Sequence, residues 1–329
     1  MKKALVFGAG GFIGSHMVSR LKSENFFVRG VDLKKPDFQD SVADEFIIFD
    51  LAKQDGFKNL LSHDGDAFDE IYQYAADMGG AGYIFSGDND ANVMTNSISI
   101  NVNLLRFNLE LSEDIDNAKT KIFYSSSACI YPEENQLTPD DPNCEESSAY
   151  PANPDSEYGW EKLFSERLYL SYLRNFGTQV RIARFHNIYG PQGTYDGGKE
   201  KVPAAICRKI IKAKDEIEIW GDGLQTRSFL YIDECIEATR RLMKSNFSNP
   251  INVGSEEMVS INELVSIVSK IAKKEINIKH IDGPLGVRGR NSSNDLIRSE
   301  LNWDYSTSLE SGMKKTYQWI ESQIKTKSS

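Results

Sequence analysis

The sequence predicts an α/β fold in which a doubly wound parallel sheet is joined to a smaller C-terminal α/β domain. Three features of the 329 residues support this. Short apolar runs alternate with helical patterns, which is typical of a parallel sheet. The first run leads into a glycine-rich turn, and the alternation breaks after Pro191. We therefore expect the sheet domain over 1–188, with 228–254 returning to it, and the smaller domain mainly over 189–227 and 255–329.

Composition argues against several classes of protein. The net charge of -10 argues against binding to nucleic acid or to a membrane surface, since both need a cationic face. No apolar run approaches the roughly 20 residues of a membrane span, and the N-terminus lacks a signal-peptide pattern. The four cysteines form no CxxC pair and the four histidines no HExxH, so no metal is expected. We expect a cytoplasmic protein.

The N-terminal turn predicts a Rossmann-type site for a dinucleotide. The apolar residues 4–7 precede it, and an amphipathic helix follows to about Leu21. Glycines make the turn tight, let the backbone approach a pyrophosphate and let the helix pack near the strand, with its first amides facing the phosphates. The expected cofactor-binding residues of this turn are Gly8, Gly11, Phe12, Ile13 and Gly14.

Two carboxylates extend the cofactor site along the next strands. The run 27–31 ends at Asp32, 18 residues after Gly14, which is close to the spacing expected for an acid that binds the adenosine ribose. A carboxylate there repels a 2′-phosphate and favours NAD over NADP, although two lysines that follow soften the preference. Asp50, which ends a third strand over 45–51, either meets the adenine or is an ordinary strand-end acid.

A serine-rich segment follows a later strand that begins near Ile122. Ligands of open α/β sheets bind beyond the carboxyl ends of the strands, so polar side chains here face a substrate. Side chains alternate along extended backbone, and we therefore expect Ser127 and Cys129 to point the same way. The alternative is a serine-rich turn with a small buried cysteine.

A YxxxK pattern completes a candidate hydride-transfer triad of Ser127, Tyr158 and Lys162. Asp155 and Ser156 are candidate caps of the helix that carries it, and the spacing of four places Tyr158 and Lys162 on one face. A tyrosine has an unperturbed pKa of about 10, and we expect the nearby ammonium to lower it.

Two further features concern partners. The long helical pattern over about 93–113 pairs with its copy in a homodimer or simply packs on the sheet. The segments 220–227 and 286–291 place arginines beside glycines in an acidic chain. Arginine matches phosphate oxygens bidentately, so these segments predict a diphosphate site.

With these residues assembled, the chain resembles the extended short-chain dehydrogenase/reductases and, among them, the GDP-mannose 3,5-epimerase family. The stretches that carry the resemblance run from Gly8 to about Trp303: 75–80, 126–132, 184–191, 220–228 and 283–291. Lysine stands at 199 where the family usually has arginine, and Val202 replaces an alanine.

The resemblance implies the chemistry. It implies NAD as the cofactor, a GDP-mannose-like nucleotide sugar as the substrate, and the smaller domain as the one that binds it. Tyr158 is then the redox acid/base, with Lys162 and Ser127, while Cys129 and Lys201 form the acid/base pair for epimerisation. The substrate contacts implied are Met78, Gly79, Ser127, Cys129, Asn187, Glu200, Lys201, Lys209, Gln225, Arg227 and Arg290.

The residues are also compatible with other functions. A nucleotide-sugar 4-epimerase would not need Cys129 as an acid or base. A GDP-4-keto-6-deoxysugar epimerase/reductase would consume NADPH. A dinucleotide-binding regulator without activity would not need Ser127, Tyr158 and Lys162 together.

Overall fold

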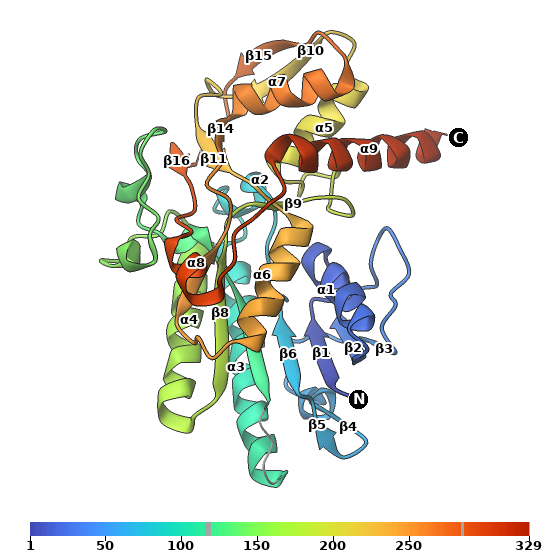
Figure 1. Ribbon diagram of the computed structural model, residues 1–329, viewed down its shortest axis with the longest axis vertical. Coiled ribbons are helices and arrows are strands. Elements are labelled where there is room, and N and C mark those ends of the chain that lie inside the picture. The colour runs from blue at the N-terminus through green and yellow to red at the C-terminus, as the bar shows by residue number, and fades with distance from the viewer. Residues whose placement is uncertain (116–119, 284–285, 329) are drawn as a thin grey trace.

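A parallel sheet of seven strands forms the centre of the computed structural model, which describes residues 1–115, 120–283 and 286–328 (Figure 1). The strands lie in the order β13-β8-β7-β6-β1-β2-β3, and each neighbouring pair is parallel. The chain starts in the middle and extends the sheet in both directions, so the predicted doubly wound fold is confirmed. The strand bounds are β1 (Lys3–Phe7), β2 (Phe27–Asp32), β3 (Glu45–Ile48), β6 (Glu70–Gln73), β7 (Lys121–Ser127), β8 (Gln179–Phe185) and β13 (Pro250–Val253).

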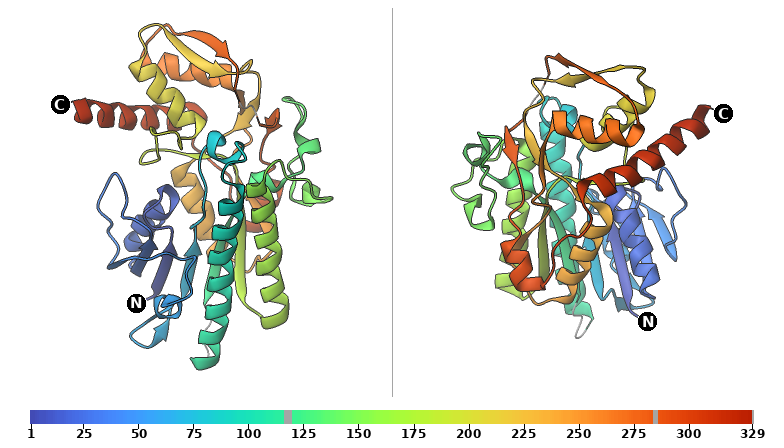
Figure 2. Two further views of the ribbon diagram at one scale, coloured as in Figure 1. Left: turned by 180° about the vertical axis from the view of Figure 1, so that it is seen from behind. Right: turned by 45° about the horizontal axis from the view of Figure 1, so that its top comes forward.

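Two pairs of long helices cover the two faces of this sheet (Figures 1 and 2). Because side chains alternate along a strand, β1 contributes to two separate apolar cores. Ala4 and Val6 pack with α1 and α6, whereas Leu5 and Phe7 pack with α3 and α4 on the opposite face. The bounds are α1 (Phe12–Ser23), α3 (Asp90–Asp114), α4 (Glu157–Phe176) and α6 (Ile232–Lys244).

The smaller part of the chain lies beyond the carboxyl ends of the strands, at the top of Figure 1. Three helices pack together there beside the parallel pair β10–β15, and a second small sheet has the order β14-β11-β16. The bounds are α5 (Val202–Lys212), β10 (Glu216–Trp220), β11 (Thr226–Ser228), β14 (Met258–Ser260), α7 (Ile261–Ala272), β15 (Asn277–Ile281), β16 (Gly289–Arg290) and α9 (Leu309–Ser328).

Short elements connect these parts. They are β4 (Ser62–His63), β5 (Asp66–Ala67), α2 (Ala81–Ile84), β9 (Ile188–Tyr189), β12 (Leu230–Tyr231) and α8 (Asp295–Leu301), with 3₁₀ turns at Phe57–Leu60, Ala128–Ile130, Glu133–Gln136 and Glu146–Ala149. In the described part of the chain, no helix has both the length and the apolar character that crossing a membrane requires.

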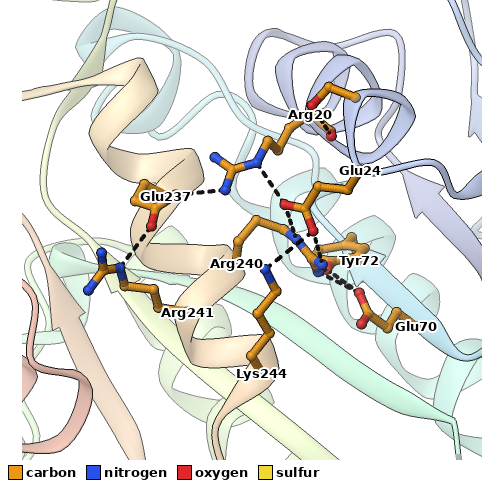
Figure 3. A network of polar contacts seen from close by, with 9 residues as sticks. Arg20, Glu24, Glu70, Tyr72, Glu237, Arg240, Arg241 and Lys244 are labelled. Atoms are coloured by element: carbon orange, nitrogen blue, oxygen red, sulfur yellow. Dashed lines mark hydrogen bonds and ion pairs between the residues drawn. The ribbon is translucent and has the colours of Figure 1, made fainter.

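A buried network of charges holds α6 where the chain returns to the sheet (Figure 3). The guanidinium of Arg240 on α6, which is 1% exposed, donates to Glu24 at the end of α1 at 2.7 Å. It also donates to Glu70 of β6 at 2.5 Å and contacts the hydroxyl of Tyr72. The network therefore joins α6 to α1 and to the sheet. Removing one partner would be strongly destabilising, because it would leave a buried charge uncompensated.

The predicted third strand is too long. β3 ends at Ile48, and the chain turns at Asp50, whose Oδ1 accepts a hydrogen bond from the Ala52 amide at 3.1 Å. Such a side-chain bond to the backbone two residues on is typical of a turn and competes with continued strand pairing.

Candidate active site

A cavity of about 450 Å³ lies between the carboxyl ends of the central strands and the smaller part of the chain. Its wall combines the loop after β6, the end of β7, the start of α4, the loop before α5, and strands β11 and β16. Lys162 lies deeper, buried beside the ring of Tyr124. The structure brings these residues predicted for catalysis or substrate contact to the cavity wall: Met78, Gly79, Ser127, Cys129, Tyr158, Asn187, Glu200, Lys201, Lys209, Gln225, Arg227 and Arg290.

The glycine turn has the shape that a dinucleotide pyrophosphate requires. Gly8 has a φ of +80°, and a Cβ on Gly14 would lie 2.0 Å from the carbonyl oxygen of Gly8. Helix α1 begins directly after Gly11, and no side chain of the described residues caps its first amides. The turn is therefore tight, and it presents free backbone donors, including those of Phe12 and Ile13, to an anion.

Asp32 lies against this turn, at the end of β2. Its Oδ2 accepts a hydrogen bond from the Gly10 amide at 2.9 Å. Burial raises the pKa of Asp32, and the hydrogen bonds from the Gly10 and Lys34 amides oppose that rise. Gly10 and Lys34 also line a smaller cavity of about 110 Å³ beside the turn. Together these groups fit NAD, whereas Asp50 remains a predicted adenine contact.

The expectation that extended backbone runs to Cys129 is wrong. β7 ends at Ser127, and a 3₁₀ turn follows because Ser127 Oγ accepts a hydrogen bond from the Cys129 amide at 3.2 Å. The hydroxyls of Ser125 and Ser126 form hydrogen bonds inside the protein. Ser125 donates to the carbonyl of Gln73, and Ser126 donates to Glu166 of α4. Ser127 and Cys129 still line the same cavity, through the turn rather than through strand alternation.

Tyr158 and Lys162 share one face of α4, as the spacing predicts. Ser156 caps the helix by accepting a hydrogen bond from the Gly159 amide. Lys162 Nζ lies 5.7 Å from the centroid of the Tyr158 ring and donates to the carbonyl of Ser125 at 3.0 Å.

The expected lowering of the tyrosine pKa is not found in this structure. Burial raises the pKa of Tyr158, and the nearby charges of Cys129 and Glu161 add to this, against a hydrogen bond from Ser127. Burial also lowers the pKa of Lys162. Burial therefore outweighs any effect of the nearby ammonium on the pKa of Tyr158.

Cys129 is held in a contact that the sequence did not indicate. Its sulfur accepts a hydrogen bond from Arg290 Nη1 at 3.0 Å, and Nη2 of the same guanidinium donates to Asp155 at 2.8 Å. Nε donates to the buried amide oxygen of Gln136. Asp155, expected as a helix cap, is instead the ion-pair partner of an arginine 135 residues further along the chain.

Other polar groups face the cavity from the smaller part of the chain. Arg227 donates to the backbone carbonyl of Val287, and burial, with the nearby charge of Arg290, lowers its pKa to about 10. The side-chain oxygen of Gln225 is buried without a hydrogen-bond partner among the described residues. Pro284, in one of the stretches that carried the resemblance, lies outside the described residues.

Lys201 projects from a loop that ion pairs and close packing hold in place. It stands at the N-cap position of α5 and lines the cavity. The surrounding protein removes water from around its ammonium, and this desolvation lowers its pKa. Arg208 fixes the loop by donating to Glu200 at 2.6 Å and to the carbonyl of Tyr195 at 2.8 Å. Sequence reasoning missed Arg208, because an arginine within an amphipathic helix gives no sign of what it contacts.

One face of the loop packs on the segment after β6. Lys199 Nζ lies 4.3 Å from the centroid of the Tyr83 ring. A Cβ on Gly80 would lie 2.8 Å from the carbonyl oxygen of Glu200. On α5, which follows the loop, Lys209 donates to the carbonyl of Glu218 in β10 at 2.6 Å. Lys201 is therefore presented from a closely packed segment.

A glycine turn at a dinucleotide site, beside a cavity with serine, tyrosine and lysine at the carboxyl ends of the strands, defines an NAD-binding enzyme of the short-chain dehydrogenase type. Residues 4–254 match the model of the NAD dependent epimerase/dehydratase family, and the chain belongs to that family. NAD is its cofactor.

Individual proteins are similar to the chain in sequence or in fold. The chain is 46% identical to the GDP-mannose 3,5-epimerase of Arabidopsis thaliana over 324 residues, which are 98% of this chain and 83% of the relative. The UDP-glucose 4-epimerase of Thermotoga maritima shares the fold, with a TM-score of 0.85 at 22% identity over 98% of this chain and 99% of that one. A UDP-glucuronic acid 4-epimerase from Bacillus cereus, solved with NAD, has a TM-score of 0.78 at 26% identity, again over 98% and 99%.

Proposed function

We propose that the protein is an NAD-dependent epimerase that inverts C5, and C3, of GDP-mannose or a closely similar nucleotide sugar. One observation carries the proposal: two sets of acid/base groups border one cavity. Ser127 and Tyr158 form the first set, and Cys129 and Lys201 form the second. The 46% identity to GDP-mannose 3,5-epimerases over nearly the whole chain supports the same activity and substrate.

The first set acts on the C4 hydroxyl of the sugar. Tyr158 takes the hydroxyl proton, Ser127 hydrogen-bonds the same oxygen, and Lys162 contributes positive charge from behind the ring. Gly8, Gly11, Gly14 and Asp32 would hold NAD at the glycine turn, where the nicotinamide would supply hydride-transfer chemistry in both directions.

The second set acts on the carbons beside C4. Hydrogens at C3 and C5 of a hexose are not acidic, but a ketone at C4 stabilises the neighbouring carbanion as an enolate. Inversion then needs a base on one face and an acid on the other, which one tyrosine cannot provide. We assign these tasks to Cys129 and Lys201, which lie at the same cavity and interact electrostatically.

Arginines and amides of the smaller part complete the proposed substrate site. Arg227 suits a diphosphate, because a guanidinium matches phosphate oxygens bidentately. Arg290 lines the same cavity and stays a proposed substrate contact, while its guanidinium nitrogens bond to Gln136, Cys129 and Asp155. We propose that 189–227 and 255–329 mainly bind the nucleotide sugar, whereas 1–188 with 228–254 binds NAD. The remaining substrate contacts in the proposal are Met78, Gly79, Asn187, Glu200, Lys209 and Gln225.

The test is where solvent hydrogen appears in the product. In D2O with GDP-mannose, we expect deuterium at C5, and at C3 of the doubly inverted product, while C4 keeps its original hydrogen. Protons on a thiol or an amine exchange with water, whereas a hydride on the cofactor does not. Product NMR reads all three positions.

The rival functions give other outcomes in the same experiment. A 4-epimerase leaves all three carbons unlabelled, a dehydrogenase or reductase changes the amount of free reduced cofactor, and a binding protein returns the substrate unchanged. Recovery of the sugar nucleotide without deuterium at C5, with NAD bound, would reject the roles of Cys129 and Lys201.

Three finer features belong to the same proposal. Asp32 favours NAD over NADP by charge repulsion, which calorimetric titration of the cofactor-free protein measures. The cytoplasm is the proposed location, and cell fractionation tests it. The protein is a homodimer through α3 and α4, where Val102, Trp160 and Phe164 are 36%, 39% and 48% exposed on helices that pack side by side. A monomeric mass by light scattering at micromolar concentration would contradict the dimer.

A further inference from the structure

Asp155 lines the cavity but has no task in the reaction proposed above. Its Oδ2 accepts a hydrogen bond from Arg290 Nη2 at 2.8 Å, and both side chains are 6% exposed. The other terminal nitrogen of the same guanidinium lies 3.0 Å from the sulfur of Cys129. One arginine therefore joins a buried carboxylate to the thiol.

The groups that act electrostatically on Cys129 are mainly cations. They come from α4, from the loop before α5, from β11 and from β16, and they are Lys162, Lys201, Arg227 and Arg290. The titratable groups that face the thiol in neutral form are Tyr158 and Cys144, which are both buried.

Few carboxylates offset these cations. Glu161 lies 4.0 Å from Lys162, and burial raises its pKa, which disfavours its charged form. Glu200 lines the cavity but is paired with Arg208 at 2.6 Å. Among the described residues that line the cavity, Asp155 is the carboxylate that pairs with Arg290, whose guanidinium contacts the sulfur of Cys129.

We propose that Asp155 is a positioning residue for Cys129: it holds Arg290 against the sulfur and offsets the arginine's charge, so that the thiol can both release and regain a proton. This rests on the proposed function, in which Cys129 moves protons. Uncompensated cations would hold the sulfur as a thiolate, which accepts a proton but has none to donate. An acid/base group needs both protonation states near the working pH.

Asp155→Asn separates the charge from the geometry. The amide oxygen of asparagine can accept the same hydrogen bond from Arg290. The arginine also keeps its bond to Gln136, whose side chain is fully buried. The charge of Arg290 then acts on the sulfur without its carboxylate partner, which favours the thiolate.

The experiment is the pH dependence of Cys129 alkylation by iodoacetamide, in protein saturated with NAD and free of sugar nucleotide. The thiolate displaces iodide, so the rate follows the thiolate fraction. Cys144, Cys207 and Cys235 are at most 1% exposed, and peptide mass mapping identifies the alkylated residue. We expect the pH of half-maximal rate to fall by about one unit or more in Asp155→Asn.

Matched variants make the outcome decisive. Asp222→Asn removes the same charge from an exposed ion pair with Arg288, 3.0 Å long, and should leave the midpoint unchanged. Asp155→Glu keeps the charge and should keep the wild-type midpoint. If Asp155→Asn does not fold, as judged by circular dichroism, Asp155→Ser provides the neutral side chain. An unchanged or higher midpoint in the folded neutral variant, or an equal shift in Asp222→Asn, would overturn the proposal.

The result is independent of turnover. A lower midpoint in a protein that places no deuterium at C5 would reject the proposed reaction and retain the effect of Asp155 on the thiol. Deuterium at C5 together with an unchanged midpoint would retain the proposed reaction and reject the effect of Asp155 on the thiol.

Discussion

Replacement of Gly159 by alanine tests whether the catalytic geometry depends on the close approach of two backbone segments. Gly159 follows Tyr158 in the first turn of α4, where the helix meets the 3₁₀ turn that carries Cys129. A Cβ at this position would lie 2.2 Å from the carbonyl oxygen of Cys129 and 2.8 Å from Cβ of Pro154. Both neighbours are part of the wall of the site or of the turn that leads into α4.

The size of the effect follows from these distances. Ordinary van der Waals contact begins near 3.4 Å, so α4 or the cysteine turn must move. A displacement of about 1 Å between reacting groups costs roughly 100-fold in rate, and overpacking of this kind costs about 1–3 kcal/mol of stability. We therefore expect Gly159→Ala to fold, with a moderately lower free energy of unfolding and a large loss of kcat/KM.

Product formation from GDP-mannose and urea unfolding measure the two effects. Glu157→Ala, exposed on the same turn of α4, is the control for helix perturbation and should stay close to wild type in both assays. A Gly159→Ala enzyme as active as the wild type would refute the reasoning. It would mean that Tyr158 and Cys129 do not depend on this approach of the two segments.

Three further predictions follow from the structure. Tyr158→Phe should abolish both NADH formation and epimerisation. Cys129→Ala should lose epimerisation but still form enzyme-bound NADH, which absorbance measures. Wild-type epimerisation by Cys129→Ala would contradict this division of roles. Burial lowers the pKa of His186 from 6.5 to about 4, so between these values the unfolded chain binds a proton that the folded protein does not. Stability should therefore fall by about 3 kcal/mol as the pH drops from 6.5 to 4, and urea titrations should show a flatter pH dependence for His186→Gln. Arg240→Met leaves Glu70 buried without its partner and should cost about 3–5 kcal/mol in urea unfolding, whereas Arg241→Met, in a half-exposed pair, should cost about 1 kcal/mol or less. Equal losses in the two arginine variants would argue against a stabilising role for the buried network.

The sequence by itself determined the features that are local in the chain. The parallel sheet follows from the alternation of apolar runs and helical patterns, and the cofactor turn from Gly8 and Gly14, because only glycine fits that backbone. The shared face of Tyr158 and Lys162 follows from four-residue spacing on a helix. Local rules were less reliable at element ends, where the side-chain hydrogen bonds of Ser127 and Asp50 stop the strands early.

Only the tertiary structure decided which distant residues meet. The sequence predicts Asp155 as a helix cap and Arg290 as a phosphate ligand. In the structure these two residues, 135 positions apart, form a buried ion pair, and the arginine contacts the sulfur of Cys129. Arg208 likewise gave no sign that it fixes the loop of Lys201. The physical reason is that a charged side chain carries the same local pattern whether it faces solvent or a buried partner. Its partner is selected by the packing of β16 and α5 over the ends of the strands, and the apolar cores of both parts of the chain determine that packing together.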